Sequence, residues 1–261
     1  MVDYNPYEMI AFTSSKLLED ETTVFIGTGL PMIAALHAQK THAPNIILLF
    51  ESGPLGPIME LGLPISVGDT KAGIKSCVMK GLCMAFELTQ RGFIDYGFIG
   101  GAEIDQYGNA NATMVGDDYF HPKVRFPGSG GAGAMAANCE RTIIIMPLEK
   151  RRFSKKIHFV TNIGYGDGST DYRKRAGVLG KGPWRVVTHM AVFGFDETTK
   201  KMILLEVAPG YKVDDVLAKL DFEPLIPRDG VKQMAMPTPE DVKIIKEIDP
   251  EGLFLKRKVE K

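Results

Sequence analysis

The segment Asn45-Ile46-Ile47-Leu48-Leu49-Phe50-Glu51-Ser52-Gly53-Pro54 decides the fold class of this chain. Its apolar run is continuous rather than alternating, which is typical of a parallel strand buried on both faces. A glutamate follows the run directly, and Ser-Gly-Pro then ends the strand. Because open parallel sheets bind ligands beyond the carboxyl ends of their strands, we expect Glu51 at the functional edge of an α/β protein. Taken alone, an exposed loop carboxylate is the simpler interpretation.

The composition of the whole chain is that of an ordinary globular protein. Its 261 residues are 44% hydrophobic and 24% charged, and the formal net charge is -1. This length suffices for a sizeable core. The net charge shows none of the basic excess that is typical of nucleic-acid-binding proteins. No apolar run approaches the roughly 20 residues of a membrane helix, and the first 20 residues do not resemble a signal peptide.

The three cysteines, Cys77, Cys83 and Cys139, have neither the spacing of metal ligands nor that of a disulfide framework. Cys77 and Cys83 lie in an apolar pattern of helical period, so we expect them to be small core residues. This cysteine usage predicts a reducing, cytoplasmic location.

A helix, a strand and a glycine loop precede the opening segment. Residues 5–19 read as a helix, with Asn5 as its N-cap and Pro6 at the first position. Residues 23–26 form a short strand that leads into Gly27-Thr28-Gly29 and a helix over 32–40. Backbone amides at such a loop suit a phosphate or an oxyanion, although tight turns also use glycine where no ligand binds.

Strands and helices continue to alternate along the chain. We expect strands at 95–99, 142–146, 157–161, 185–195 and 202–207, and helices at 74–91, 134–139, 213–220 and 239–248. The polar run 196–201 reads as a hairpin connection, and the long Gly- and Pro-rich excursion 52–73 lies beside Glu51. No repeat or clear linker divides the chain. We therefore predict a single domain, residues 1–261, with a variable C-terminal extension from about residue 200.

Several common chemistries lack their motifs. No G-x-S-x-G follows a strand, and neither G-x-G-x-x-G nor a P-loop is present. The five histidines are scattered, with His37 and His42 expected on a helix surface, so we predict no metal site. A carboxylate faced by glycine loops, with no evident general base, makes sense if Glu51 is itself the nucleophile. A glutamate ionised at neutral pH needs no base, and glycine-loop amides can hold the oxyanion that its attack creates.

Many short blocks in one order resemble family I CoA-transferases over nearly the full length, in particular the B subunit of glutaconate CoA-transferases. The matching blocks are Gly27-Thr28-Gly29-Leu30-Pro31, Glu51-Ser52-Gly53, Ser66-Val67-Gly68-Asp69, Gly100-Gly101-Ala102, Tyr107-Gly108-Asn109 with Asn111, His121-Pro122-Lys123, Gly128-Ser129-Gly130-Gly131-Ala132, Glu149-Lys150-Arg151-Arg152-Phe153 and Ile248-Asp249-Pro250. The agreement is weakest at residues 54–64.

The resemblance implies an open, mostly parallel sheet sandwiched by helices, and a homologous A subunit as partner in a hetero-oligomer. It implies no permanently bound cofactor, with coenzyme A entering as the acyl-CoA substrate. The family's catalytic glutamate carries over to Glu51, which would form a glutamyl-CoA thioester in a ping-pong exchange. The implied oxyanion and CoA-binding residues are Gly27, Thr28, Gly29, Asn111, Gly128, Gly130 and Gly131, and the implied substrate loop holds Ser52, Gly53, Gly100 and Gly101.

Three other readings stay open at this point. Relatives of this fold hydrolyse acyl-CoA bonds or open rings, and a water molecule that reaches the glutamyl thioester would turn transfer into hydrolysis. The chain could instead be a non-catalytic partner, against which an intact Glu51 argues. Sugar-phosphate isomerase chemistry would need a basic phosphate clamp, for which Lys123 and Arg125 are the only candidates near the glycine loops. His121 fits its family block without an assigned role.

Overall fold

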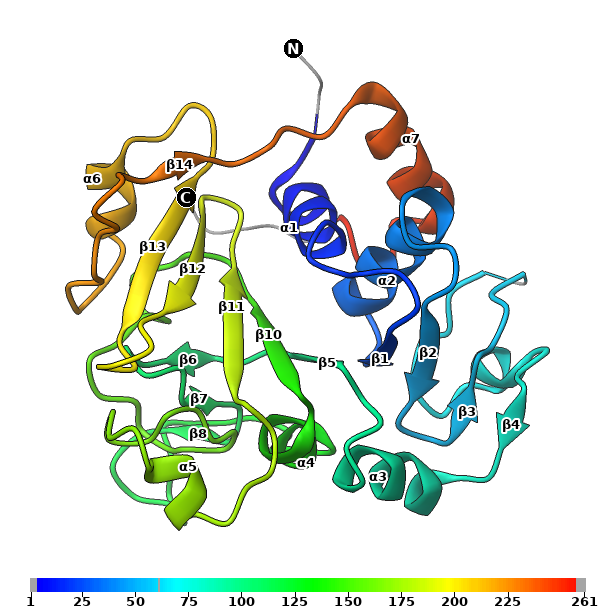
Figure 1. Cartoon of the computed structure of the whole chain (residues 1–261), viewed down its shortest axis with the longest axis horizontal. Helices are drawn as coiled ribbons and strands as arrows, with labels where there is room; N and C mark the ends of the chain where they lie inside the picture. Colours follow the sequence, from blue (N-terminus) through cyan, green and yellow to red (C-terminus); the bar gives the residue numbers. More distant parts are fainter. Residues whose placement is uncertain (1–3, 61, 257–261) are drawn as a thin grey trace. The chain divides into compact units, whose positions relative to one another are not determined.

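A computed structural model describes residues 4–60 and 62–256 of the chain (Figure 1). The chain divides into two compact units, which we describe separately. Unit 1 comprises Met1–Phe98 with Ala235–Lys261, and unit 2 comprises Ile99–Met234. Residues 1–3, 61 and 257–261 lie outside the described residues. Leu61 belongs to the segment 54–64, where the family resemblance is weakest, and the two chain ends belong to the predicted domain 1–261.

The sheet of unit 1 is built on three parallel strands. These are β1 (Thr23–Ile26), β2 (Ile47–Phe50) and β5 (Tyr96–Ile99), with β1 in the middle. β3 (Pro54–Leu55) and β4 (Val78–Met79) extend the β2 side in antiparallel pairing. Val24, Phe25 and Ile26 of β1 are completely buried, as the continuous apolar runs predict.

Three helices of unit 1 contact one another: α1 (Pro6–Ser15), α2 (Leu30–Thr41) and α7 (Pro239–Ile248). α1 begins with the predicted cap, because the Asn5 side chain accepts from the Tyr7 and Glu8 amides while the Glu8 carboxylate accepts from the Asn5 amide. α7 brings the C-terminal region into unit 1. The remaining helical elements are η1 (Thr70–Gly73) and α3 (Leu82–Gln90).

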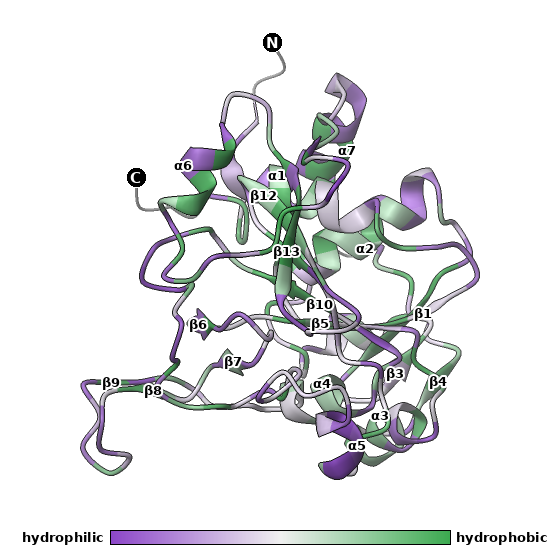
Figure 2. Ribbon diagram, turned by 60° about the vertical axis from the view of Figure 1, so that its left-hand side comes forward, coloured by the Kyte–Doolittle hydropathy of each residue, from purple (hydrophilic) through white to green (hydrophobic). Residues whose placement is uncertain are grey.

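Unit 2 carries the strands β10 (Arg141–Ile145), β11 (Pro183–Val187), β12 (Ala191–Phe195), β13 (Met202–Val207) and β14 (Lys232–Gln233), paired in this order. β10 and β11 are parallel, whereas β11, β12 and β13 form an antiparallel meander. Two small ribbons pair β6 (Glu103–Ile104) with β7 (Ala110–Asn111) and β8 (Met114–Val115) with β9 (Val124–Arg125). The helices are α4 (Ala132–Asn138), α5 (Tyr172–Arg175) and α6 (Val213–Leu217), of which α5 is strongly hydrophilic (Figure 2).

The predicted α/β class is confirmed: parallel strands form the middle of the unit 1 sheet, and antiparallel strands extend its edge. The strands at 23–26 and 202–207 and the helix at 239–248 have their predicted bounds. In the part of the chain that the structure describes, no helix has the length and apolar character needed to cross a membrane.

Other local predictions are wrong. Residues 157–161 form no regular strand, because side chains take the place of a neighbouring strand as hydrogen-bond partners of much of the backbone. The Glu103 carboxylate, for example, accepts a hydrogen bond from the His158 amide. The strand predicted at 185–195 is two strands, since the Thr188 hydroxyl accepts from the Met190 and Ala191 amides and turns the chain. The helix predicted from residue 74 begins only at Leu82.

The burial predicted for three side chains is also wrong. Cys77 and Cys83 are exposed, because Cys77 precedes α3 and Cys83 lies on its outer side. His37, predicted on a helix surface, is completely buried. Its ring lies between α1 and α7, with the Ser15 hydroxyl 2.8 Å from Nδ1 and an Asp241 carboxylate oxygen 3.1 Å from Nε2.

Candidate active site

Glu51 lies at the carboxyl edge of the unit 1 sheet, next to the glycine loop that follows the neighbouring strand. The register of the parallel pair sets Ile26 opposite Phe50, so Gly27 and Glu51 are the first residues beyond two adjacent strand ends. The sequence therefore predicted this juxtaposition correctly. Glu51 is half-buried, and its side chain makes no hydrogen bond or ion pair with any residue that the structure describes. A carboxylate in this position is available to a ligand.

The Gly27–Gly29 loop presents unused amide groups. Gly29 has φ +99°, which glycine adopts without strain, and is the N-cap of α2. Within residues 4–60 and 62–256, neither the Thr28 amide nor the Gly29 amide finds a hydrogen-bond acceptor. A Cβ added to Gly27 would meet nothing within 4 Å, so the space beside the loop is open. Free amides and a helix N-terminus together favour an anion at this point.

The Ser52-Gly53 turn fixes the backbone directly after Glu51. The Gly53 amide donates to the Phe50 carbonyl over 3.0 Å, and the Ser52 hydroxyl donates to the Val67 carbonyl. Gly53 has φ +111°, and a Cβ there would lie 2.2 Å from the Gly81 backbone nitrogen. Only glycine can occupy this position, so the backbone carrying Glu51 is held by the approach of a second chain segment.

The remaining predicted site residues lie in unit 2, and several of them are neighbours. The Ala102 amide donates to the Asn111 carbonyl over 2.6 Å, which places Gly100 and Gly101 beside β7. The Gly128 amide donates to the Ala112 carbonyl over 2.9 Å. Gly130 and Gly131 follow in the loop that leads into α4, with Gly131 as its N-cap. Unit 2 thus gathers the glycine pair, Asn111 and the Gly128 loop in one neighbourhood.

The Asn111 carboxamide is buried and fully bonded. It donates to a Glu103 carboxylate oxygen and to the Met114 carbonyl, each over 2.6 Å. Its oxygen accepts from the Thr113 amide over 2.9 Å. The side chain therefore fixes the turn between β7 and β8, and a role in holding an oxyanion stays a prediction.

The charged block at 149–152 is partly internal rather than a solvated face. Glu149 is buried and accepts from Arg151 Nε and Arg152 Nε, each over 2.9 Å. Burial opposes ionisation of Glu149, but the hydrogen bonds from Arg152 and Arg151 outweigh it and lower the pKa of this carboxyl group. Arg152 also donates to the Gly101 carbonyl, so the block supports the glycine pair.

Comparison with known proteins identifies the family. The model of the coenzyme A transferase family matches residues 7–219. The chain belongs to the coenzyme A transferase family. It is 39% identical to the B subunit of glutaconate CoA-transferase of Acidaminococcus fermentans, over 98% of this chain and 97% of that protein. It is 33% identical to the B subunit of 3-oxoadipate CoA-transferase of Pseudomonas knackmussii, over 95% of each.

The fold of this CoA-transferase agrees with a solved relative. The crystal structure of glutaconate coenzyme A-transferase from Acidaminococcus fermentans matches with a TM-score of 0.90 and 37% identity, over 98% of this chain and 99% of that one. The resemblance and the transferase class predicted from the sequence are thereby confirmed. The assignment of roles to individual residues stays a prediction.

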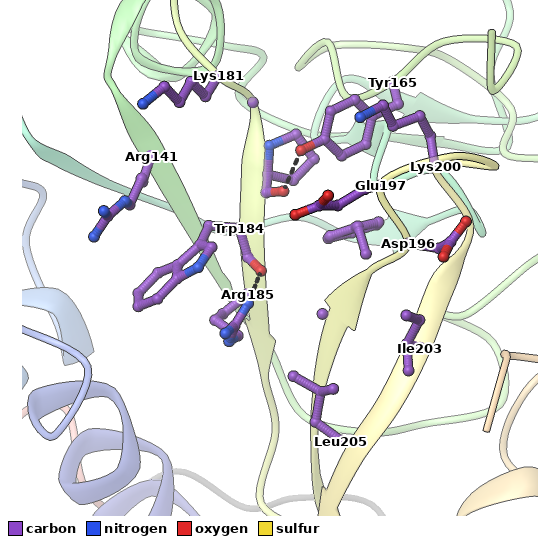
Figure 3. A pocket seen from close by; sticks show the side chains of 14 residues that line it. Arg141, Tyr165, Lys181, Trp184, Arg185, Asp196, Glu197, Lys200, Ile203 and Leu205 are labelled. Carbon is purple, nitrogen blue, oxygen red and sulfur yellow. Dashed lines mark hydrogen bonds between the residues drawn. The ribbon is translucent and has the colours of Figure 1, made fainter. Parts of the chain in front are cut away.

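One cavity of unit 2 is not at a carboxyl edge. About 700 Å³ in volume, it is lined by residues that begin the parallel strands, including Arg141 of β10 and Trp184 and Arg185 of β11 (Figure 3). The guanidinium carbons of Arg185 and Arg141 lie 4.3 and 5.1 Å from the centre of the Trp184 ring. Because α/β sheets bind their ligands beyond the opposite strand ends, we do not assign the transferase site of this CoA-transferase to this cavity.

Sequence reasoning missed one polar cluster, formed by Glu103 and His158. Glu103 is 5% exposed, and one of its carboxylate oxygens lies 2.7 Å from His158 Nδ1. The two residues are separated by 55 positions, and the strand predicted at 157–161 concealed the irregular segment that brings them together. Because no short motif contains both residues, only the three-dimensional structure could reveal the pair.

Proposed function

We propose that this chain is the B subunit of a heteromeric CoA-transferase that moves CoA between a glutaconate-like (di)carboxylic acyl-CoA and an acceptor acid. Glu51 carries the acyl exchange as a glutamyl-CoA thioester in a ping-pong sequence. The observation that carries this proposal is the position of Glu51: a carboxylate at a strand end, unpaired among the described residues, adjacent to a loop with two amides that no described residue accepts from. The residues 1–261 would form one B-subunit domain with a variable C-terminal part.

The reaction follows from the chemistry of the carboxylate. A Glu51 oxygen attacks the thioester carbonyl, the carbon–sulfur bond breaks, and CoA leaves as the thiolate with a mixed anhydride on Glu51. The thiolate then attacks the Glu51 carbonyl carbon, which releases the first acid as its carboxylate and leaves glutamyl-CoA. An acceptor carboxylate repeats both steps in reverse. No proton is needed in the balance, which agrees with a site that has no evident general base.

The Thr28 and Gly29 amides would stabilise the oxyanion of each tetrahedral intermediate. They are bound to no other acceptor among the described residues and stand at the positive end of α2. Donors fixed in place before the reaction lose nothing to reorganisation, and removal of one typically costs about 10²–10³ in kcat. The predicted contributions of Asn111, Gly128, Gly130 and Gly131 belong to the same proposal.

The partner would be a homologous A subunit. Both the glutaconate and the 3-oxoadipate relative are named as B subunits, which supports an assembly of two kinds of chain. A cytoplasmic location is part of the proposal, supported by the free thiols of Cys77, Cys83 and Cys139.

Two substitutions at Glu51 test the proposal in the assembled enzyme. Glu51→Gln should abolish the nucleophile and reduce kcat by about 10⁴-fold or more. Glu51→Asp keeps the charge but withdraws it by one methylene, which breaks the near-attack geometry and should also remove most of the activity. Glu60→Gln, which alters an exposed carboxylate in the same excursion, serves as the control and should retain full turnover. Near-native turnover by Glu51→Asp would remove Glu51 from the nucleophile role.

A further inference from the structure

Glu103 is a buried carboxylate that joins two distant segments of unit 2. It accepts from the Asn111 carboxamide over 2.6 Å and from the His158 amide over 3.1 Å, and its second oxygen lies 2.7 Å from His158 Nδ1. In the described part of the chain, His158 is the single basic side chain within ion-pair distance of it. Buried carboxylates are usually compensated by hydrogen bonds, and here these come from Asn111 and His158.

This contact orients the His158 ring. A neutral imidazole whose Nδ1 hydrogen is donated to a carboxylate must present Nε2 as the acceptor, because the other partner of a histidine fixes its tautomer. Nε2 itself bonds to no residue of 4–60 or 62–256. The side chain is 37% exposed, so the ring can be reached from outside the protein.

His158 lines a cavity of about 360 Å³ that lies within unit 2. The apolar part of its wall includes Met114, Ile157 and Phe159, and the Phe159 ring centre lies 5.7 Å from that of Tyr119. Two charged residues also line it, Lys156 and Asp117, and no described residue forms an ion pair with either. The volume falls in the range of small-molecule sites, about 300–1,000 Å³, and the mixture of apolar wall and few polar groups is typical of them.

We propose that this cavity binds the carboxyl group of a small carboxylic acid through His158 Nε2. A carboxylate only accepts hydrogen bonds, so its binding takes up one proton from solvent; the ring then donates from Nδ1 to Glu103 and from Nε2 to the bound acid. The apolar wall takes the carbon chain, and Lys156 adds attraction for the acid while Asp117 opposes it. Binding at this cavity is independent of the function proposed above; only the identification of the acid as a substrate rests on it.

Equilibrium dialysis of labelled butyrate against the assembled, CoA-free enzyme tests the proposal. Binding needs no turnover, so a failure of the Glu51 mechanism leaves this measurement unaffected. Butyramide, which has the same chain without the carboxyl group, should bind at least about tenfold more weakly, as expected for the loss of a charged hydrogen bond. Equal binding of butyrate and butyramide would contradict recognition of the carboxyl group.

His158→Asn is the sharpest variant, because asparagine can still donate to Glu103 but has no counterpart of Nε2. It should weaken butyrate binding about tenfold. His121→Gln is the matched control, since His121 is an exposed histidine paired with Asp118 in the same unit, and it should change nothing. Unaltered butyrate binding by a folded, assembled His158→Asn enzyme would overturn the proposal.

Two exposed charges provide a second test that does not depend on the buried pair. Lys156→Met should weaken butyrate binding and Asp117→Asn should strengthen it, each about two- to fivefold for a single exposed charge. Opposite shifts, or none in either variant, would place the acid elsewhere.

Kinetics distinguish the two sources of such an acid. If the cavity holds the acid substrate, His158→Asn raises KM for the acid and leaves KM for the acyl-CoA unchanged. If it holds an acid effector, both KM values stay the same and only inhibition or activation by butyrate disappears. Both outcomes support a carboxylic-acid site, and the butyrate-binding measurements above decide whether the site exists.

Discussion

At the scale of single residues, the candidate active site is held in place by close backbone packing more than by side-chain hydrogen bonds. Glu51 itself is unbonded among the described residues, whereas Gly53, two residues later, is packed against the backbone of Gly81. The close approach fixes the turn that presents the carboxylate. Precise placement of a nucleophile is worth orders of magnitude in rate, so a rigid support next to a free side chain is what the proposed chemistry requires.

Gly53→Ala should therefore destabilise the protein strongly. The added Cβ would lie 2.2 Å from the Gly81 nitrogen, and φ is +111°, so both packing and backbone are strained. We expect a loss of about 2–4 kcal/mol in the free energy of unfolding, measured by urea denaturation. Gly27→Ala is the control, because its Cβ would meet nothing within 4 Å, and it should cost no more than about 1 kcal/mol. A similar loss in both variants would contradict the packing argument.

The sequence was sufficient to locate Glu51 but not His158. Glu51 follows an uninterrupted apolar run, and the end of such a run can be located from the sequence alone. His158 depends on a hydrogen bond to Glu103 across 55 residues, and no local pattern encodes such a pair. Ile157 and Phe159 alternate with polar residues, and this alternation resembles the pattern of a strand. In the structure, however, the His158 amide donates its hydrogen bond to a side chain, the Glu103 carboxylate.

At the scale of elements, α1, α2 and α7 are held together by a buried polar contact as well as by apolar packing. His37 of α2 reaches Ser15 at the end of α1 and Asp241 of α7. Burial lowers the pKa of His37, despite the opposing effect of Asp241. The helices could be predicted from their caps and apolar periods, but the apolar neighbours of His37 gave no sign of its polar partners.

This contact predicts a dependence of stability on pH. Because the pKa of His37 is lower in the folded state than its reference value of 6.5, the unfolded chain binds the proton more readily. Stability is then complete above pH 6.5 and is lost as the pH falls below it. His37→Gln should reduce the slope of the free energy of unfolding below pH 6.5, measured by urea denaturation at several pH values.

His189 should contribute to the same slope in the unaltered protein and in His37→Gln. Burial lowers its pKa to about 4, so the loss of stability that it causes extends down to that pH. An unaltered slope in His37→Gln would mean that the His37 proton does not distinguish the folded from the unfolded chain.

The N-cap of α7 is a further element-scale test. The Thr238 hydroxyl accepts from the Asp241 amide over 3.1 Å, and the Asp241 carboxylate accepts from the Thr238 amide over 2.9 Å. Thr238→Ala should lower the free energy of unfolding by about 1 kcal/mol, measured by denaturation at neutral pH. Thr199→Ala, in the exposed 196–201 turn, is the control for the loss of a threonine hydroxyl that caps no helix. It should lower the free energy of unfolding by less than half as much as Thr238→Ala.

At the scale of the whole molecule, this CoA-transferase chain exposes large apolar side chains. Phe120 is 82% exposed, and Ile65 and Leu179 are each 70% exposed. Isolated apolar residues are common on surfaces, but an assembly with a second chain would give such side chains a partner surface. The sequence could not show this exposure, because it depends on loops whose periodicity is irregular.

The isolated chain should consequently be inactive and prone to aggregate, whereas co-expression with an A subunit should restore solubility and turnover. Size-exclusion chromatography and a CoA-transfer assay on the chain alone and on the co-expressed complex check this expectation. Full activity of the chain alone would contradict the need for a partner.

Borohydride trapping tests the central claim most directly. The complex is incubated with an acyl-CoA, reduced with borohydride, and digested for mass spectrometry. The glutamyl-CoA mechanism predicts reduction of the Glu51 side chain to the alcohol, dependent on acyl-CoA and absent from Glu51→Gln. An unmodified Glu51 in a complex that still consumes acyl-CoA would contradict the mechanism and point to direct hydrolysis.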